Sequence, residues 1–232
     1  MKLYQLMVGA TEIIRKEGRN YEDRHHRRGR SLLTARIRVA EEWDAQAIAD
    51  IYAPAVTGRA TSFELTPPDA NEMKRRIFTV LPQHPWLVCE SSETILGYVY
   101  ATTHRERAAY KWSVDVAAYV GADARRRGIA TALYTALFEI LALQGYRNAY
   151  AGITLPNPAS VAMHEAMGFE RVGTYHRVGY KMDRWHDVAW FERPLAEHVL
   201  EPPEPVAFST LSASREARVA ISRAEGLLRQ TY

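Results

Sequence analysis

Cysteine and long apolar runs are both scarce in this chain of 232 residues. Since Cys89 is the only cysteine, no disulfide can form within the chain, which fits a reducing compartment. The longest nearly apolar run, 129–143, contains Glu139 and is too short to cross a bilayer. Glu12 and Arg15 interrupt the apolar start of the chain, which makes it a poor secretory signal. We therefore expect a cytoplasmic protein without a membrane partner.

The net charge is small as well, formally +3 at pH 7. A charge of this size does not indicate a nucleic-acid-binding protein, and we expect no nucleic-acid partner. Basic residues gather in 21–30, a run without hydrophobic periodicity. It predicts a mobile leader over 1–35, or translation from an upstream start codon, with a nucleic-acid-binding or membrane-binding arm as the alternative. His25 and His26 have no other metal ligands near them in the sequence, so no metal is expected.

Internal repeats are absent, and the chain is long enough for one domain with extensions. A hydrophobic content of 47% and a charged content of 25% are ordinary for a globular domain. We expect a domain over 36–195 and then a proline-rich linker and C-terminal tail over 196–232. Within this tail, 213–229 could form an amphipathic helix.

Hydrophobic periodicity, helix caps and turn residues predict the order of the elements. Expected strands cover 36–39, 86–90, 95–103, 112–120 and 148–154, with two or three more within 170–176, 179–183 and 186–193. Expected helices follow Asp44 as far as Pro54 or shortly beyond, follow the N-cap Asp69 over 70–80, and cover 129–144 and 157–167. This order predicts an α/β fold with a mixed, mostly antiparallel central sheet and helices on both faces. Only two crossovers are of the parallel type, so the fold is not doubly wound.

A basic turn lies between the strand 112–120 and the helix 129–144. Free backbone N–H groups at a helix start, the helix dipole and a close-approaching glycine together bind phosphate. The sequence is neither a Walker loop nor a dinucleotide-binding GxGxxG. A basic turn that only caps a surface helix is the alternative interpretation. The residues that would bind phosphate are Arg125, Arg126, Arg127, Gly128, Ile129, Ala130 and Thr131.

In this order of elements, Arg125-x-x-Gly128-x-Ala130 resembles the acetyl-CoA signature of the GCN5-related N-acetyltransferases (GNAT). The resemblance covers 36–195 and implies the acyl-CoA N-acyltransferase fold, with the turn holding the coenzyme A pyrophosphate. A second family element is an Asn followed by a small residue, here Asn157 and Ser160, and then a general-acid tyrosine. His164 stands at the position of that tyrosine.

This difference narrows the resemblance to the phosphinothricin (bialaphos-resistance) N-acetyltransferases. The stretches that resemble this family are Tyr110-x-Trp112-Ser113-Val114, 155–166, Gly179-Tyr180-Lys181 and 185–188. The resemblance implies that acetyl-CoA is the co-substrate and that Asp115 is the base that removes the ammonium proton. The family usually has a glutamate there, so the shorter Asp115 makes a bridging water more favourable. The alternative is a polar side chain on the solvated face of the strand, but the flanking Val114 and Val116 favour a cleft position.

The resemblance assigns further roles around the thioester. His164 would donate a proton to the thiolate or accept one from the amine, or else it is a buried histidine bonded to a backbone carbonyl. Backbone N–H groups of Ala118, Tyr119 and Val120 would stabilise the oxyanion. Asn157 would bond the pantetheine arm; its alternative role is an N-cap.

The acceptor site is expected in the connection after 95–103. Arg105, Arg107 and Tyr110 lie where the family binds the anionic group of its substrate, and a guanidinium clamps a carboxylate or phosphinate with two hydrogen bonds. A solvated charge run is the alternative reading of this connection. Phe63 is expected to form a wall of the pocket, while Trp112 and Trp185 are expected in the core or in an interface.

The sequence thus predicts an N-acetyltransferase that moves acetyl from acetyl-CoA directly to a small acidic amino acid or analogue in a ternary complex. One alternative keeps the fold but acetylates a protein N-terminus or lysine. Another is a non-catalytic module that binds coenzyme A. The resemblance also implies a homodimer in which the terminal strands contribute to the interface.

Overall fold

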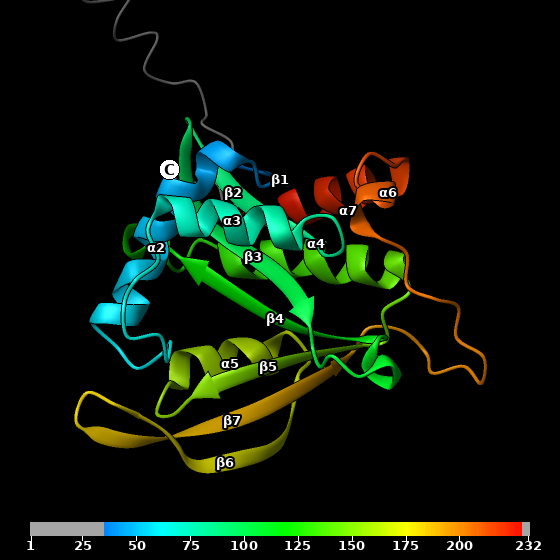
Figure 1. Ribbon diagram of the computed structural model, residues 1–232. Coiled ribbons are helices and arrows are strands. Elements are labelled where there is room, and N and C mark those ends of the chain that lie inside the picture. The colour runs from blue at the N-terminus through cyan, green and yellow to red at the C-terminus, as the bar shows by residue number, and fades with distance from the viewer. Residues whose placement is uncertain (1–34, 229–232) are drawn as a thin grey trace, which may run out of the picture. The chain divides into compact units, whose positions relative to one another are not determined.

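The computed structural model describes residues 35–228, and it is built on one seven-stranded sheet (Figure 1). The predicted leader up to residue 34, with His25 and His26, lies outside the described residues. The strand order is β1-β2-β3-β4-β5-β7-β6. The strands are β1 (Arg36–Val39), β2 (Trp86–Ser91), β3 (Thr94–Thr103), β4 (Ser113–Val120), β5 (Asn148–Thr154), β6 (Glu170–Lys181) and β7 (Arg184–Pro194).

The β4–β5 pair is parallel, and every other neighbouring pair in this sheet is antiparallel. The predicted fold class, a mixed and mostly antiparallel sheet with helices on both faces, is confirmed. The two stretches predicted at 170–176 and 179–183 form one strand, β6, whose register shifts between Tyr175 and Gly179. Arg177 within this shift has a positive φ of 48°. The polar break in the sequence therefore marks an irregularity and not a turn between strands.

The helices agree closely with the sequence pattern, and side-chain caps begin α3, α5 and α7. They are α2 (Ala45–Thr57), α3 (Ala70–Val80), α4 (Ile129–Gln144), α5 (Pro158–Ala166), α6 (Phe208–Leu211) and α7 (Arg215–Glu225). The predicted N-cap Asp69 accepts a hydrogen bond of 2.8 Å from the backbone of Glu72. Asn157 caps α5 by accepting one of 3.3 Å from the backbone of Ser160.

Two hydrophobic layers pack on opposite faces of the sheet. The α2 and α3 side includes Tyr52, Met73 and Tyr98, whereas α4 and α5 cover the other side. Along β4, Val114 and Val116 belong to the α4 side, and strand alternation therefore directs Asp115 to the α2 side. None of the helices within 35–228 is both long and apolar enough to span a lipid bilayer.

The C-terminal segment packs against α4, and α7 also contacts β1. The helix predicted within 213–229 is confirmed as α7, which buries Ala217, Ala220 and Ala224. Phe208 of α6 is 2% exposed. The Glu225 carboxylate accepts a hydrogen bond of 2.8 Å from the backbone N–H of Ile37. This segment therefore contributes to the core that supports α4.

Candidate active site

A cavity of about 1110 Å³ opens where β4 and β5 separate. The two strands pair only from Ser113 with Asn148 to Asp115 with Tyr150, and then diverge (Figure 1). Its lining combines 116–120 of β4, the turn after β4, the start of α4, 151–154 of β5 and part of α5. Part of α2, the loop after it and the turn between β2 and β3 complete the lining, and most of the predicted cofactor-binding residues line the cavity.

The basic turn forms one end of this cavity. Gly128 is the N-cap of α4 and has a φ of 80°, a left-handed conformation that glycine adopts without strain. Arg126 also has a positive φ, 65°. The first backbone bond of the helix runs from Ala132 to Gly128, so the N–H groups of 129–131 have no partner within α4. Arg125 and Arg126 line the cavity with 128–131, whereas Arg127 does not.

The edge of β4 supplies backbone groups along the cavity. Ala118, Tyr119 and Val120 are paired with β3 on one side, and β5 does not pair with them on the other. All three line the cavity. A strand edge without a partner offers alternating N–H and C=O groups to an extended ligand. The edge of β4 therefore leaves unpaired backbone groups along the cavity.

At the other wall, α5 contributes Asn157, Ser160 and His164. His164 is 5% exposed, and burial lowers its pKa. Its Nδ1 lies 2.8 Å from the carbonyl oxygen of Ser160, and its Nε2 lies 3.1 Å from the hydroxyl of Tyr134. A carbonyl only accepts, so Nδ1 carries the proton and Nε2 of the neutral ring accepts from Tyr134. Tyr134 also lines the cavity, and nothing in the sequence spacing pointed to this pair.

Asp115 stands at the last paired position before the strands diverge. It is not among the residues that line the cavity, although its neighbour Val116 is. Because it points to the α2 side of the sheet, it lies on the opposite face from His164. Burial raises the pKa of Asp115, and a hydrogen bond with His104 opposes this shift. The structure thus separates the two predicted catalytic side chains by the sheet itself, at the point where the sheet opens.

His104 is the residue in this region that the sequence prediction missed. Its Nδ1 lies 2.6 Å from an oxygen of Asp115, and its ring stacks on Tyr150 at 4.4 Å between centroids. Tyr110 meets the same ring edge-on at 5.8 Å. Arg105 lies 3.9 Å from the second oxygen of Asp115. The predicted acceptor residues Arg105 and Tyr110 therefore gather around His104 and Asp115.

Arg107 and Phe63 stand apart from that group. Arg107 precedes the 3-10 turn η2 (Ala108–Tyr110) and is exposed, and the contacts among residues 35–228 do not connect its guanidinium to Asp115. The Phe63 ring packs against Gly179, where a Cβ would come within 2.3 Å of it, and lies 6.2 Å from His186 between centroids. Neither Phe63 nor Arg107 lines the cavity described above.

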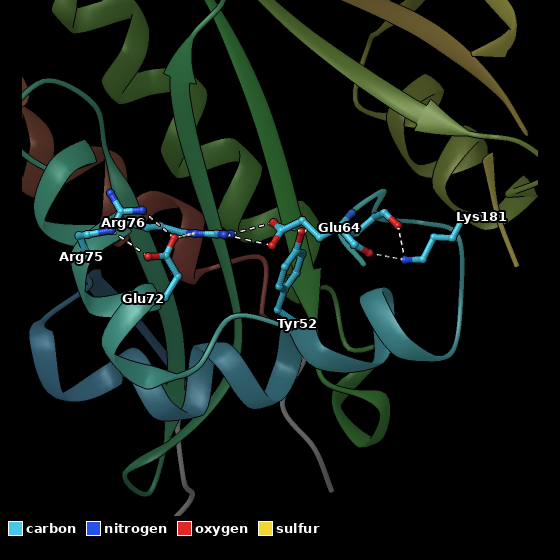
Figure 2. Close-up of polar contacts among 7 residues, drawn as sticks. Tyr52, Glu64, Glu72, Arg75, Arg76 and Lys181 are labelled. Atoms are coloured by element: carbon cyan, nitrogen blue, oxygen red, sulfur yellow. Dashed lines mark hydrogen bonds and ion pairs between the residues drawn. The ribbon is translucent and has the colours of Figure 1, made fainter. Parts of the chain in front are cut away.

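The loop that carries Phe63 is held by polar contacts from three elements (Figure 2). Lys181 donates hydrogen bonds of 2.7 Å to the carbonyl oxygens of Ser62 and Glu64. Arg76 binds both carboxylate oxygens of Glu64, at 2.8 and 3.0 Å, and lowers the pKa of that carboxyl. The Tyr52 hydroxyl donates to the same carboxylate at 2.9 Å. The loop is therefore fixed between α2, α3 and β6, and it places Phe63 against β6.

Comparison with known proteins agrees with this geometry. Residues 37–190 match the acetyltransferase (GNAT) domain family. The chain is 36% identical over 173 residues to a phosphinothricin N-acetyltransferase of Streptomyces coelicolor, with 68% of this chain and 95% of that protein covered. It is 31% identical over 162 residues to an L-methionine sulfoximine/L-methionine sulfone acetyltransferase of Pseudomonas aeruginosa, with 69% and 94% covered.

A crystal structure shows the same arrangement of elements. It is that of a GNAT superfamily phosphinothricin acetyltransferase from Sinorhizobium meliloti in complex with acetyl-CoA. The TM-score is 0.70 at 35% sequence identity, and 75% of this chain and 95% of that chain are covered. The chain therefore belongs to the GNAT family of acetyltransferases. The predicted resemblance and the predicted enzyme class, N-acetyltransferase, are confirmed.

Proposed function

We propose that this N-acetyltransferase moves acetyl from acetyl-CoA to the amino group of a small acidic amino acid or analogue of the phosphinothricin or methionine sulfoximine type. The observation that carries this proposal is the joining of two sites at the divergence of β4 and β5. One is the cavity with the basic turn, and the other is the group of Arg105, Tyr110 and Asp115 beside it. Relatives with these substrates in their names support the acceptor class.

The cofactor-binding roles follow from the lining of the cavity. We assign the pyrophosphate to the helix start at 128–131 with Arg125 and Arg126, because free N–H groups and guanidinium groups both favour an anion there. Backbone groups of 118–120 and the side chain of Asn157 would hold the pantetheine arm. Arg127 does not line the cavity, so its part is limited to the local charge.

The acceptor roles rest on charge and on proximity to Asp115. Arg105 would bind the carboxylate or phosphinate of the substrate, with Tyr110 beside it and Arg107 entering from the exposed side. Asp115 would support removal of the ammonium proton, and His164 with Tyr134 would deliver a proton to the leaving thiolate. Phe63 would border the acceptor pocket from β6.

Direct transfer in a ternary complex is favoured over an acyl-enzyme. Cys89 is fully buried in β2, and burial raises its pKa to about 12, so it offers no thiolate near neutral pH. The proposed reaction therefore needs only the amine, the thioester and groups that move protons.

Two further proposals concern assembly and location. Apolar side chains lie exposed on the β6–β7 hairpin, and they support a homodimer that buries this surface. They are Val172, Tyr175, Val178, Tyr180 and Trp185. The single buried cysteine supports a cytoplasmic location. Light scattering of the full chain and of Trp185→Glu tests the dimer, which the substitution should weaken.

The function is tested by the release of free thiol from acetyl-CoA by the full chain. Phosphinothricin, methionine sulfoximine, each common amino acid and a peptide with a free N-terminus and a lysine are offered separately. Release with the first two amines and not with the peptide supports the proposal. Release with the peptide alone favours the protein-acetylating alternative, and release with none of these amines contradicts the small-amino-acid function.

Deletion of the leader also distinguishes an enzyme from a non-catalytic module. We propose that 36–195 is the catalytic domain, so deletion of residues 1–34 should leave thiol release unchanged. A non-catalytic module whose basic leader acts in binding predicts instead that the full chain has no acetyl transfer and that the deletion abolishes binding.

A further inference from the structure

His104 and Asp115 form a short hydrogen-bonded pair beside the opening of the sheet. The imidazole Nδ1 and a carboxylate oxygen are 2.6 Å apart. Antiparallel pairing of β3 with β4 creates this contact, because Thr102 is paired with Asp115 and His104 follows β3 directly. The side chain of His104 is 11% exposed and that of Asp115 is 32% exposed. The pair is therefore sheltered but not fully closed off from solvent.

The hydrogen bond determines which ring nitrogen can accept a proton. An ionised carboxylate only accepts hydrogen bonds, so Nδ1 of His104 carries the proton and Nε2 keeps its lone pair. Among residues 35–228, no side chain or backbone group makes a hydrogen bond to Nε2 of His104. His164 differs in this respect, since both of its nitrogens are engaged.

Aromatic groups hold the His104 ring in place. Its faces and edges meet Tyr150, Tyr110 and Trp190, at 4.4, 5.8 and 6.5 Å between centroids. The titratable and charged groups around the ring come from five segments of the chain. They are Asp115 of β4, Arg105 after β3, Tyr110 of η2, Tyr150 of β5 and, beside Tyr150, Glu192 of β7.

We propose that Nε2 of His104 takes the proton from the substrate ammonium, while Asp115 orients the ring and stabilises the imidazolium. This inference rests on the proposed function and identifies the base of that reaction. Aspartate is one methylene shorter than glutamate, and the imidazole extends its reach without a bridging water. A general base works best when its proton affinity suits the operating pH, and imidazole is the side chain that ordinarily titrates nearest to neutrality.

The proton and electron balance of the step is complete. The ammonium loses one proton to Nε2, and its freed lone pair forms a bond to the thioester carbonyl carbon. When the C–S bond breaks, sulfur leaves with the electron pair and takes up one proton, and the new amide nitrogen loses one. His104 passes its proton to water, so an ammonium and a thioester give an amide, a thiol and one proton.

Substitutions of His104 separate a base from a structural hydrogen bond. His104→Asn can keep a donor near the Nδ1 position but has no base, and it should lower kcat on the order of 10²-fold or more with little change in KM for acetyl-CoA. His104→Ala should regain part of its rate when imidazole is added. The matched control is His176→Asn, because His176 also pairs with an aspartate, Asp187 at 3.1 Å, but on the exposed surface.

The pH profile of kcat distinguishes the two residues. With His104 as the base, His104→Asn should remove the fall in activity on the acidic side, and Asp115→Asn should shift this fall and lower kcat. With Asp115 alone as the base, His104→Asn leaves this fall in place.

Phosphinothricin and methionine sulfoximine are the acceptors in these assays, with thermal melting to verify folding. If the parent releases thiol and His104→Asn stays within threefold of its rate, the pair is not the base and the proposed function still stands. The same conclusion follows if imidazole does not rescue His104→Ala. A parent that releases no thiol with either amine overturns the proposed function, and the base with it.

Discussion

The Tyr134 hydroxyl lies 3.1 Å from Nε2 of His164, on a ring whose other nitrogen is fixed by the Ser160 carbonyl. This pair joins α4, the helix that begins at the basic turn, to α5, and both residues line the cavity. A proton that moves from His164 to the leaving thiolate would pass through the Tyr134 hydroxyl. The pair therefore connects α4, which begins at the basic turn, to the wall of the cavity that α5 forms.

Tyr134→Phe is the substitution that tests this link. We expect kcat to fall at least tenfold while KM for acetyl-CoA changes little, because the ring remains and only the proton path is lost. Stability should fall by about 1 kcal/mol for the lost buried hydrogen bond. Tyr146→Phe, whose hydroxyl accepts a hydrogen bond of 3.2 Å from Gln83, serves as the control for stability without the kinetic effect. Equal kcat in both variants would remove Tyr134 from the mechanism.

The basic turn contains its own matched pair of arginines. Arg125 lines the cavity and Arg127 does not. Arg125→Ala should therefore raise KM for acetyl-CoA by about tenfold, the effect of one lost charge-assisted hydrogen bond, whereas Arg127→Ala should raise it much less. Initial rates at varied acetyl-CoA and two salt concentrations provide the measurement. Identical changes in KM for the two variants would mean that the turn acts only through its overall positive charge.

Backbone conformation at the same turn gives an independent test. Gly128 has a φ of 80°, which a residue with a Cβ adopts only at a cost of about 1 kcal/mol or more. Gly128→Ala should lower the free energy of unfolding by about that amount and weaken acetyl-CoA binding. Calorimetric titration with acetyl-CoA and denaturant unfolding measure the two effects. Unchanged affinity would show that the start of α4 does not approach the ligand closely.

The C-terminal segment should matter for stability more than for chemistry. Phe208 is 2% exposed, whereas Leu200 is fully exposed at 103%. Phe208→Ala should cost about 3–5 kcal/mol of unfolding free energy, and Leu200→Ala should cost little. Denaturant unfolding of the full chain checks both, and KM for acetyl-CoA should stay constant below the transition. Equal costs for the two variants would contradict the packing of this segment on α4.

Acid sensitivity follows from His84, which stacks on Tyr146 at 5.6 Å between centroids. Burial lowers the pKa of His84 to about 4, while the unfolded chain binds that proton near pH 6.5. Between these values the unfolded state holds more protons, so stability is full above about pH 6.5 and falls as the pH drops, by up to about 3 kcal/mol near pH 4. His84→Phe should flatten this dependence in unfolding experiments across that range. If the free energy of unfolding falls with pH equally in parent and variant, other groups cause the loss of stability in acid.

The sequence predicted local features well because their causes are local. The cap at Asp69, the glycine at the start of α4 and the apolar period of α7 each act over a few residues. Strand alternation likewise separated Asp115 from Val114 and Val116. The resemblance of the turn and of the α5 region was enough to predict the family.

Contacts between distant segments could not be predicted in the same way. His104 meets Asp115 because of the β3–β4 register, and Tyr134 meets His164 because α4 packs beside α5. Spacing along one helix or strand contains no information on either contact. The packing of α7 on α4 was missed for the same reason, although the helix itself was expected.

The central claim is that the full chain acetylates the amino group of a small acidic amino acid, and its most direct test follows the product. Acetyl-CoA and phosphinothricin are incubated with the full chain, and mass spectrometry is combined with the thiol assay. We predict thiol release that depends on the amine and equals the amount of phosphinothricin made heavier by one acetyl group on nitrogen. Thiol release without an acetylated amine, or none with phosphinothricin, methionine sulfoximine or any common amino acid, would contradict it.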